Sequence, residues 1–218
     1  MEAPVVDMVS KEVANLEKET VIVGGSRAFL VLKRTFDIVV AACAGLVLLI
    51  PMLIIALLVR IDSNGPALFR QERLGVNGKP FMMYKFRSMY LDAEASGPKW
   101  ADKNDCRCTK MGRFLRKSRI DELPQLFNIL RGDMSFVGPR PERACFYDEF
   151  EKYIPTFRDR LLVRPGLTGL AQVNGGYELK PEEKIVYDME YIVNRSVKMD
   201  LLCLWRTVLV VFSHDGAR

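Results

Sequence analysis

The longest uncharged stretch of the chain restricts its fold more than any other feature. It covers residues 38 to 59, which read IVVAACAGLVLLIPMLIIALLV, 22 residues without a charge. As a helix it would be roughly 33 Å long, about the thickness of a bilayer's hydrocarbon core. It begins too late for a secretory signal peptide, and no small-residue cleavage site follows it. We therefore predict a membrane-anchoring helix over 33–60, with a buried core helix as the alternative.

A proline lies past the middle of this stretch. Pro51 lacks a backbone donor and its ring clashes with the preceding turn, so it predicts a kink. Spanning helices tolerate such kinks, but a kinked helix can also turn back and leave by the side it entered. Cations flank the stretch on both sides, Lys33 and Arg34 before it and Arg60 after it, which suits a helix that does not cross. We predict a re-entrant helix, with a spanning helix as the alternative.

The positive charge of the chain is concentrated beside this segment. Residues 60 to 120 hold 14 Lys/Arg and 6 Asp/Glu, a net charge of +8, whereas the whole chain carries +5. An anionic lipid surface, nucleic acid or a phosphorylated substrate would fit such a segment. Its position next to the apolar stretch favours lipid headgroups, phosphates or both.

Cysteine and histidine content excludes several classes of chemistry. The chain has one histidine, His214, so a Ser/His/Asp or Cys/His catalytic arrangement is not expected. Its cysteines form neither a disulfide framework nor a zinc pattern, and unpaired cysteines fit a reducing cytosol. The five are Cys43, Cys106, Cys108, Cys145 and Cys203.

The remaining patterns predict an α+β chain that is mostly helical. We expect an N-terminal extension over 1–32 and a globular cytosolic domain over 61–218. Alternating residues around VNGK predict a small β-hairpin within 67–89. Loops are expected over 92–112 and 164–176. Helices are expected over 122–131, from 141 with a break near Pro155, over 181–194, and over 197–212, the last in the core or in the bilayer interface.

The stretch KSRIDELPQL places two carboxylates side by side. Proline is tolerated in the first turn of a helix, so Pro124 predicts a helix that begins near residues 121 to 123. Asp121 and Glu122 would then lie at its N-terminus, where the dipole and free N–H groups keep a carboxylate ionised. Such a carboxylate could attack phosphorus or bind Mg²⁺. The alternative is ordinary helix capping.

Cations surround this pair in the sequence. Arg116 and Arg119 precede it, and Arg140 follows on a stiff loop between Pro139 and Pro141, which suits a diphosphate or nucleotide. The YKFRSM stretch adds Lys85 and Arg87 at the end of the predicted hairpin. For each of these cations the alternative is a solvated face or a lipid contact.

Taken together, these motifs resemble the bacterial sugar transferase family, the monotopic phosphoglycosyl transferases. The resemblance rests on the apolar stretch with its proline, YKFRSM, KSRIDELPQLFNILRGDMSFVGPRPE and RPGLTGLAQVNGG, in this order from Lys33 onward. The family's helix is re-entrant and broken at a Ser-Pro pair, where this chain has Ile50-Pro51. With few residues before the apolar stretch, the chain resembles the short, catalytic-core form.

The resemblance implies transfer of a sugar-1-phosphate from a UDP-sugar to undecaprenyl phosphate, with release of UMP. It implies that Asp121 is the nucleophile, through a covalent phosphosugar intermediate, and that Glu122 helps to bind Mg²⁺ beside it. The family's basic positions correspond to Lys85, Arg116 and Arg140, with Pro141 near the nucleotide. Membrane lipid is a further expected partner, nucleic acid is not, and a homo-oligomer is left open.

This resemblance also implies a location. The protein is expected at the inner membrane of a bacterium, with its catalytic domain on the cytosolic face, where it would begin the assembly of a polysaccharide. The alternative hypothesis is a membrane-anchored basic module that binds nucleic acid or anionic lipid without catalysis.

Overall fold

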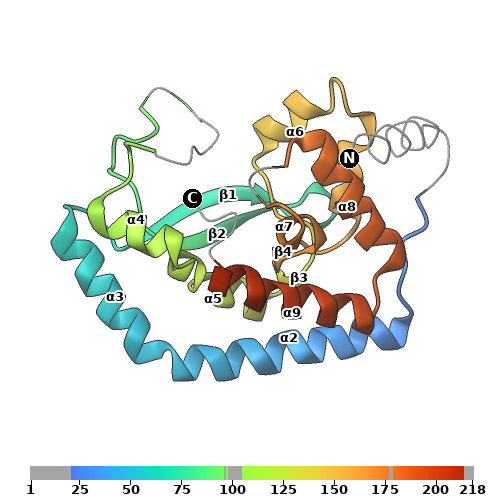
Figure 1. Ribbon diagram of the computed structural model, residues 1–218, viewed down its shortest axis with the longest axis horizontal. Coiled ribbons are helices and arrows are strands. Elements are labelled where there is room, and N and C mark those ends of the chain that lie inside the picture. The colour runs from blue at the N-terminus through green and yellow to red at the C-terminus, as the bar shows by residue number, and fades with distance from the viewer. Residues whose placement is uncertain (1–20, 96, 98–104, 177–178, 214–218) are drawn as a thin grey trace.

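The computed structural model describes residues 21–95, 97, 105–176 and 179–213. It shows a mostly helical chain with a small antiparallel hairpin, as predicted, and a bent helix pair beneath the rest of the molecule (Figure 1). Most of the predicted extension and His214 lie outside the described residues.

The apolar stretch forms two helices rather than one. Helix α2 covers Arg27–Val47, α3 covers Leu49–Asp62, and their axes bend by 63° at Leu48. The bend confirms the kink predicted from Pro51, although it lies three residues before the proline. This offset is expected because a proline ring clashes with the carbonyl four residues back, here that of Val47. Among the described residues, no single helix has the length and hydropathy to cross a bilayer, whereas the bent pair together does.

The first half of α2 packs into the globular part of the molecule. Its Ser26 cap accepts a hydrogen bond from the backbone N–H of Phe29 at 3.2 Å. Asp37 is fully buried and accepts from the hydroxyl of Ser135 and the N–H of Phe136. Ala41 is buried in an apolar cluster between the hairpin and helix α5 (Gln125–Arg131). The helix therefore begins before the predicted anchor boundary at residue 33 and belongs to the core along one face.

The predicted hairpin is present. Strands β1, Leu68–Leu74, and β2, Pro80–Phe86, pair antiparallel, with Leu68 opposite Phe86 and Leu74 opposite Pro80. A short 3-10 turn, η1 (Val76–Gly78), joins them, and Asn77 adopts a left-handed backbone conformation there. The hairpin places Lys85 and Arg87 at the end of β2, as the sequence predicted.

The loop predicted over 92–112 ends earlier than expected, because helix α4 (Lys110–Lys117) begins within it. The hydroxyl of Thr109 caps it by accepting from the N–H of Gly112 at 2.9 Å. Gly112, which the predicted loop included, is required by close packing, since a Cβ there would lie 1.9 Å from the carbonyl oxygen of Ser88.

The prediction of a loop over 164–176 was wrong in part, because this segment contains a strand of a parallel pair and a short helix. Strand β3, Ser135–Val137, pairs with β4, Gly166–Thr168, and helix α7, Leu170–Val173, follows directly. The glycines that suggested a loop permit this close approach, because a Cβ on Gly166 would lie 2.2 Å from the backbone nitrogen of Gly138. Strands of three residues are too short for periodicity to predict.

The C-terminal helices enclose the main core. They are α6 (Ala144–Phe150), the 3-10 helix η3 (Pro155–Leu162), α8 (Pro181–Asn194) and α9 (Val197–Ser213), so the predicted break near Pro155 is confirmed. Helix α9 lies beside α2 (Figure 1), where Lys33 pairs with Asp200 at 2.6 Å. Its Cys203 is buried in the core, whereas Trp205 is 63% exposed on the other face.

Candidate active site

The two adjacent carboxylates lie in a short turn that precedes a helix. Asp121 and Glu122 belong to the 3-10 turn η2, Ile120–Glu122, and α5, Gln125–Arg131, begins just after Pro124. The predicted helix start near residues 121 to 123 is therefore displaced by a few residues. Arg119 enters the turn with a left-handed φ of 57°, which reverses the chain after α4.

Glu122 is held by two cations. Lys85 donates to its Oε1 at 2.8 Å and Arg140 donates to the same oxygen at 2.5 Å. Burial opposes ionisation of this carboxyl, but Arg140 and Lys85 outweigh it and hold the pKa of Glu122 well below its usual range. The hairpin and the Pro-Arg-Pro loop, which are 55 residues apart, are thereby joined through one carboxylate.

Asp121 has a different environment from its neighbour. It is 7% exposed, and burial raises the pKa of its carboxyl to about 6, with Lys85 opposing the shift and Glu122 adding to it. This corrects the expectation that the site strongly favours the ionised form. A pKa of about 6 still leaves the carboxylate as the main form at neutral pH, and it makes that carboxylate more basic than an ordinary aspartate.

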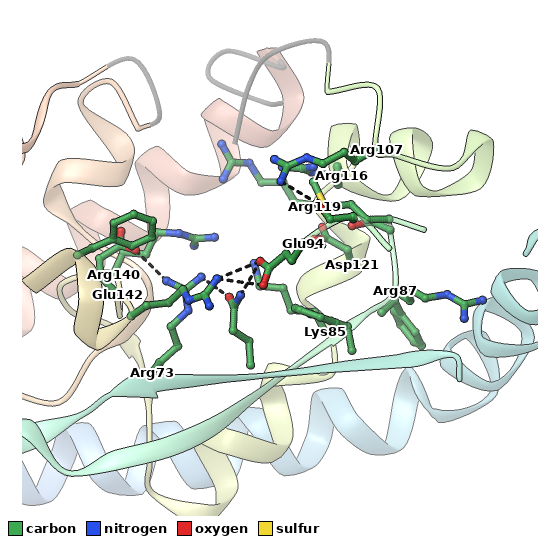
Figure 2. A pocket seen from close by; sticks show the side chains of 18 of the residues that line it. Arg73, Lys85, Arg87, Glu94, Arg107, Arg116, Arg119, Asp121, Arg140 and Glu142 are labelled. Carbon is green, nitrogen blue, oxygen red and sulfur yellow. Dashed lines mark hydrogen bonds and ion pairs between the residues drawn. The ribbon is translucent and has the colours of Figure 1, made fainter. Parts of the chain in front are cut away.

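A cavity of about 410 Å³ opens in front of Asp121. This volume lies within the usual range of small-molecule sites. Figure 2 shows cationic side chains from the hairpin, α4 and the Pro-Arg-Pro loop around the cavity. Its charged lining holds ten cations and three carboxylates, which suits a ligand with several negative charges. The cations are Arg73, Lys85, Arg87, Arg107, Arg116, Arg119, Arg140, Arg143, Arg160 and Lys184, and the carboxylates are Glu94, Asp121 and Glu142.

Most of the predicted cations meet around this cavity. Lys85, Arg116, Arg119 and Arg140 line it together with Asp121. Arg116 also donates to the sulfur of Cys108 at 3.0 Å, which fixes its guanidinium over the site. Pro141 contributes through its backbone, because its carbonyl accepts from Arg73 at 3.1 Å.

Arg87 borders the cavity, but its guanidinium makes it the exception among the predicted phosphate-binding residues. Its guanidinium is buried and donates to the carbonyls of Val59, Ser63 and Asn64 at the end of α3, the shortest bond being 2.5 Å. In Figure 2 its side chain points away from Asp121. We therefore interpret Arg87 as a cap of the α3 C-terminus.

A buried ion pair behind the cavity was not predicted. Arg160 donates to Asp188 at 2.7 Å, both side chains are almost fully buried, and Arg160 also donates to the carbonyl of Arg140 at 3.0 Å. The pair therefore supports the Pro-Arg-Pro loop from below. A signal was available, since Asp188 lies between Ile185 and Ile192 on the apolar face of its helix.

The carboxylate pair offers part of the set of oxygen ligands that magnesium uses. In the part of the chain that the structure describes, no group of three His, Cys, Asp or Glu side chains is placed to hold a metal. Magnesium commonly uses only one or two protein carboxylates, with phosphate oxygens and water completing its shell. Asp121 and the second oxygen of Glu122 meet that requirement.

Comparison with known proteins identifies the class to which this fold and site belong. The model of the bacterial sugar transferase family matches residues 28–214. The chain therefore belongs to the bacterial sugar transferase family.

Three relatives show the range of that similarity. A UDP-N-acetylgalactosamine-undecaprenyl-phosphate N-acetylgalactosaminephosphotransferase of Aeromonas hydrophila is 43% identical over 86% of this chain and 45% of its own length. A UDP-glucose:undecaprenyl-phosphate glucose-1-phosphate transferase of Caulobacter vibrioides is 43% identical over 85% of this chain and 71% of its own. An exopolysaccharide production protein of Rhizobium leguminosarum bv. phaseoli is 43% identical over 83% of this chain and 94% of its own. The chain thus spans about half the length of the first relative.

Proposed function

We propose that this protein transfers a sugar-1-phosphate from a UDP-sugar to undecaprenyl phosphate and releases UMP. The observation that carries the proposal is the buried Asp121 carboxylate at the wall of a strongly cationic cavity. The printed names of the Aeromonas and Caulobacter relatives describe transfers of this kind. The Rhizobium relative is named for exopolysaccharide production.

The proposed reaction has two steps at one phosphorus atom. A carboxylate oxygen of Asp121 bonds to the sugar-bearing phosphorus, the bond from that phosphorus to the bridging oxygen breaks, and UMP leaves with that oxygen. A phosphate oxygen of undecaprenyl phosphate then bonds to the same phosphorus, and the bond to Asp121 breaks. The carboxylate is regenerated, so one site serves two anionic substrates that need not be present together.

The cations have distinct tasks in this proposal. Arg116 and Arg119 lie on the α4 side of the cavity and would neutralise the diphosphate. Glu122 forms ion pairs with Lys85 and Arg140. Both positive charges therefore stay beside Asp121 while they bond to Glu122. A magnesium ion held by Asp121 and Glu122 would supply further neutralisation of phosphate charge.

We also propose that the bent helix pair enters the inner membrane from the cytosolic face and returns to it. Support comes from the 63° bend and from the large apolar side chains exposed around it, such as Val47, Ile50 and Leu53. The break lacks a hydroxyl side chain beside Pro51. Helical hydrogen bonding resumes directly after the break, because the backbone N–H of Met52 donates to the carbonyl of Leu48.

A panel of UDP-sugars tests the proposed transfer. Purified protein with Mg²⁺ and undecaprenyl phosphate would be incubated with UDP-N-acetylgalactosamine, UDP-glucose or UDP-galactose, and UMP and lipid-linked sugar would be measured. We expect both products from at least one donor, in equal amounts. Failure of every donor, together with salt-sensitive binding of DNA or RNA, would favour the basic binding module instead.

A further inference from the structure

A second cavity, of about 440 Å³, lies at the N-terminal half of α2. It shares no lining residue with the cavity in front of Asp121. Its walls combine apolar and cationic side chains from α2, the hairpin turn, the segment before β4 and the end of α8. The lining residues that matter here are Leu30, Val31, Arg34, Ile38, Arg164 and Arg195.

None of the three guanidinium groups at this cavity forms an ion pair among the described residues. Arg34 donates only to backbone carbonyls, those of Ile129 and Leu130, and Arg195 donates to the carbonyl of Gly24. Arg164 is exposed, and no hydrogen bond or ion pair engages it among the described residues. By contrast, the fourth cation of the cavity, Lys33, forms an ion pair with Asp200.

The carboxylates whose charges act on these cations, Asp37 and Asp200, accept their hydrogen bonds from other groups. Asp37 accepts from Ser135 and Phe136, and Asp200 accepts from Lys33 and Tyr191. Partial burial and the neighbouring charge of Arg34 lower the pKa of Arg164, and Asp37 opposes this shift without reversing it, which indicates that the two cations repel each other. An anion placed between them would remove this repulsion.

The apolar wall of the cavity selects among anions. Leu30 is 39% exposed and Ile38 is 42% exposed, and both belong to the helix that continues into the apolar stretch. A soluble phosphate would leave these side chains in water. A lipid would cover them with its acyl chains while its phosphate meets the guanidinium groups.

We propose that this cavity is a binding site for the phosphate of an anionic phospholipid headgroup, held by Arg34, Arg164 and Arg195. The bound lipid would fix the N-terminal end of α2 at the membrane surface, next to the ion pair between α2 and α9. This proposal rests on the membrane association proposed above and does not depend on the transfer reaction.

The test is a titration of the purified full-length chain, kept in a neutral detergent, with a short-chain phosphatidylglycerol. Matched titrations use short-chain phosphatidylcholine, inorganic phosphate and undecaprenyl phosphate, and the readout is the midpoint of thermal unfolding. We expect a saturable rise with phosphatidylglycerol that exceeds the rise with phosphatidylcholine. Arg164→Gln should raise the phosphatidylglycerol concentration that gives half of the full rise about tenfold, because one charge-assisted hydrogen bond to the phosphate is lost.

Arg131→Gln is the matched control, because Arg131 is 63% exposed in its side chain and lines neither cavity. It should leave the response unchanged. Equal responses to both phospholipids, or a phosphatidylglycerol response that Arg164→Gln does not weaken, would overturn the proposal. A stronger Arg164-dependent response to inorganic phosphate or undecaprenyl phosphate would also overturn it, in favour of that ligand.

Activity of the same samples separates the two proposals. Arg164→Gln should release UMP from the UDP-sugar at the rate of the unchanged protein when assayed in detergent. If no donor is turned over while the lipid response still depends on Arg164, the transfer reaction is wrong and the lipid site stands.

Discussion

At the scale of single residues, two adjacent carboxylates differ because cations are distributed unequally between them. One oxygen of Glu122 accepts from both Lys85 and Arg140, whereas Asp121 faces the cavity without such a bond among the described contacts. A carboxylate that is neutralised by two donors is a poor nucleophile. The neighbour that retains a raised pKa and an open face is the better one.

Arg87 provides a prediction about stability rather than catalysis. Arg87→Ala should remove the cap of α3 and leave buried carbonyls without a donor, at a cost of about 1–3 kcal/mol in the free energy of unfolding. Thermal unfolding measures this loss. Arg113→Ala, an exposed residue of α4, is the control and should change the midpoint little. If Arg87→Ala instead raised KM for the UDP-sugar at unchanged stability, the predicted phosphate-binding role would be restored.

The residue types in the site could be predicted, but the division of tasks among them could not. Lys85, Arg116 and Arg140 were predicted from motifs, and the structure brings them to one cavity. The sequence could not separate Arg87 from Lys85, because residues two apart on a strand share one face, and only the structure shows that β2 ends at Phe86, before Arg87. The place of Asp188 on an apolar helix face was a signal for a buried partner, but nothing in the sequence identifies that partner as Arg160.

At the scale of elements, one proline determines how the apolar stretch lies. Its ring excludes a continuous helix through Val47, and the helix resumes after Leu48 in a new direction. The kink could be predicted from the presence of Pro51 in the stretch. The N-terminal limit at Arg27 could not, because a serine such as Ser26 is as common in a turn as at a helix N-cap.

Replacing this proline should change topology. Pro51→Leu restores the missing donor and the turn, so α2 and α3 should join into a helix long enough to cross the bilayer. Single cysteines placed at residues 27 and 63 of a cysteine-free background would be labelled with a membrane-impermeant reagent in inverted inner-membrane vesicles. We expect both to react in the parent protein and only one in Pro51→Leu. Reaction at a single flank of the parent would mean that the pair spans the membrane.

At the scale of the whole molecule, the membrane segment and the globular part share one core. Arg34 caps α5, Asp37 bonds β3, and Ala41 packs with Met83 and Ile129. In the proposed membrane arrangement, a helix tied in this way would position the cavity relative to the bilayer surface. In the proposed reaction, such a connection would let a soluble donor and a lipid acceptor reach the same phosphorus atom.

A truncation tests whether the segment is separable. A chain that begins at residue 63 should not unfold cooperatively, because it exposes the apolar cluster that Ala41 covers and leaves Ser135 without its carboxylate partner. Circular dichroism during heating would measure this against a chain that begins at residue 21. A sharp transition in the shorter chain would show that the anchor is an independent part.

The covalent intermediate at Asp121 is the central claim, and labelling of the protein by a radioactive UDP-sugar tests it most directly. Without acceptor, the unchanged protein and the control Asp148→Asn, whose side chain is 64% exposed, should each retain sugar phosphate on the chain. Undecaprenyl phosphate should then remove that label, and Asp121→Asn should carry none and release no UMP. Full turnover by Asp121→Asn would contradict the account and indicate direct transfer between the two bound substrates.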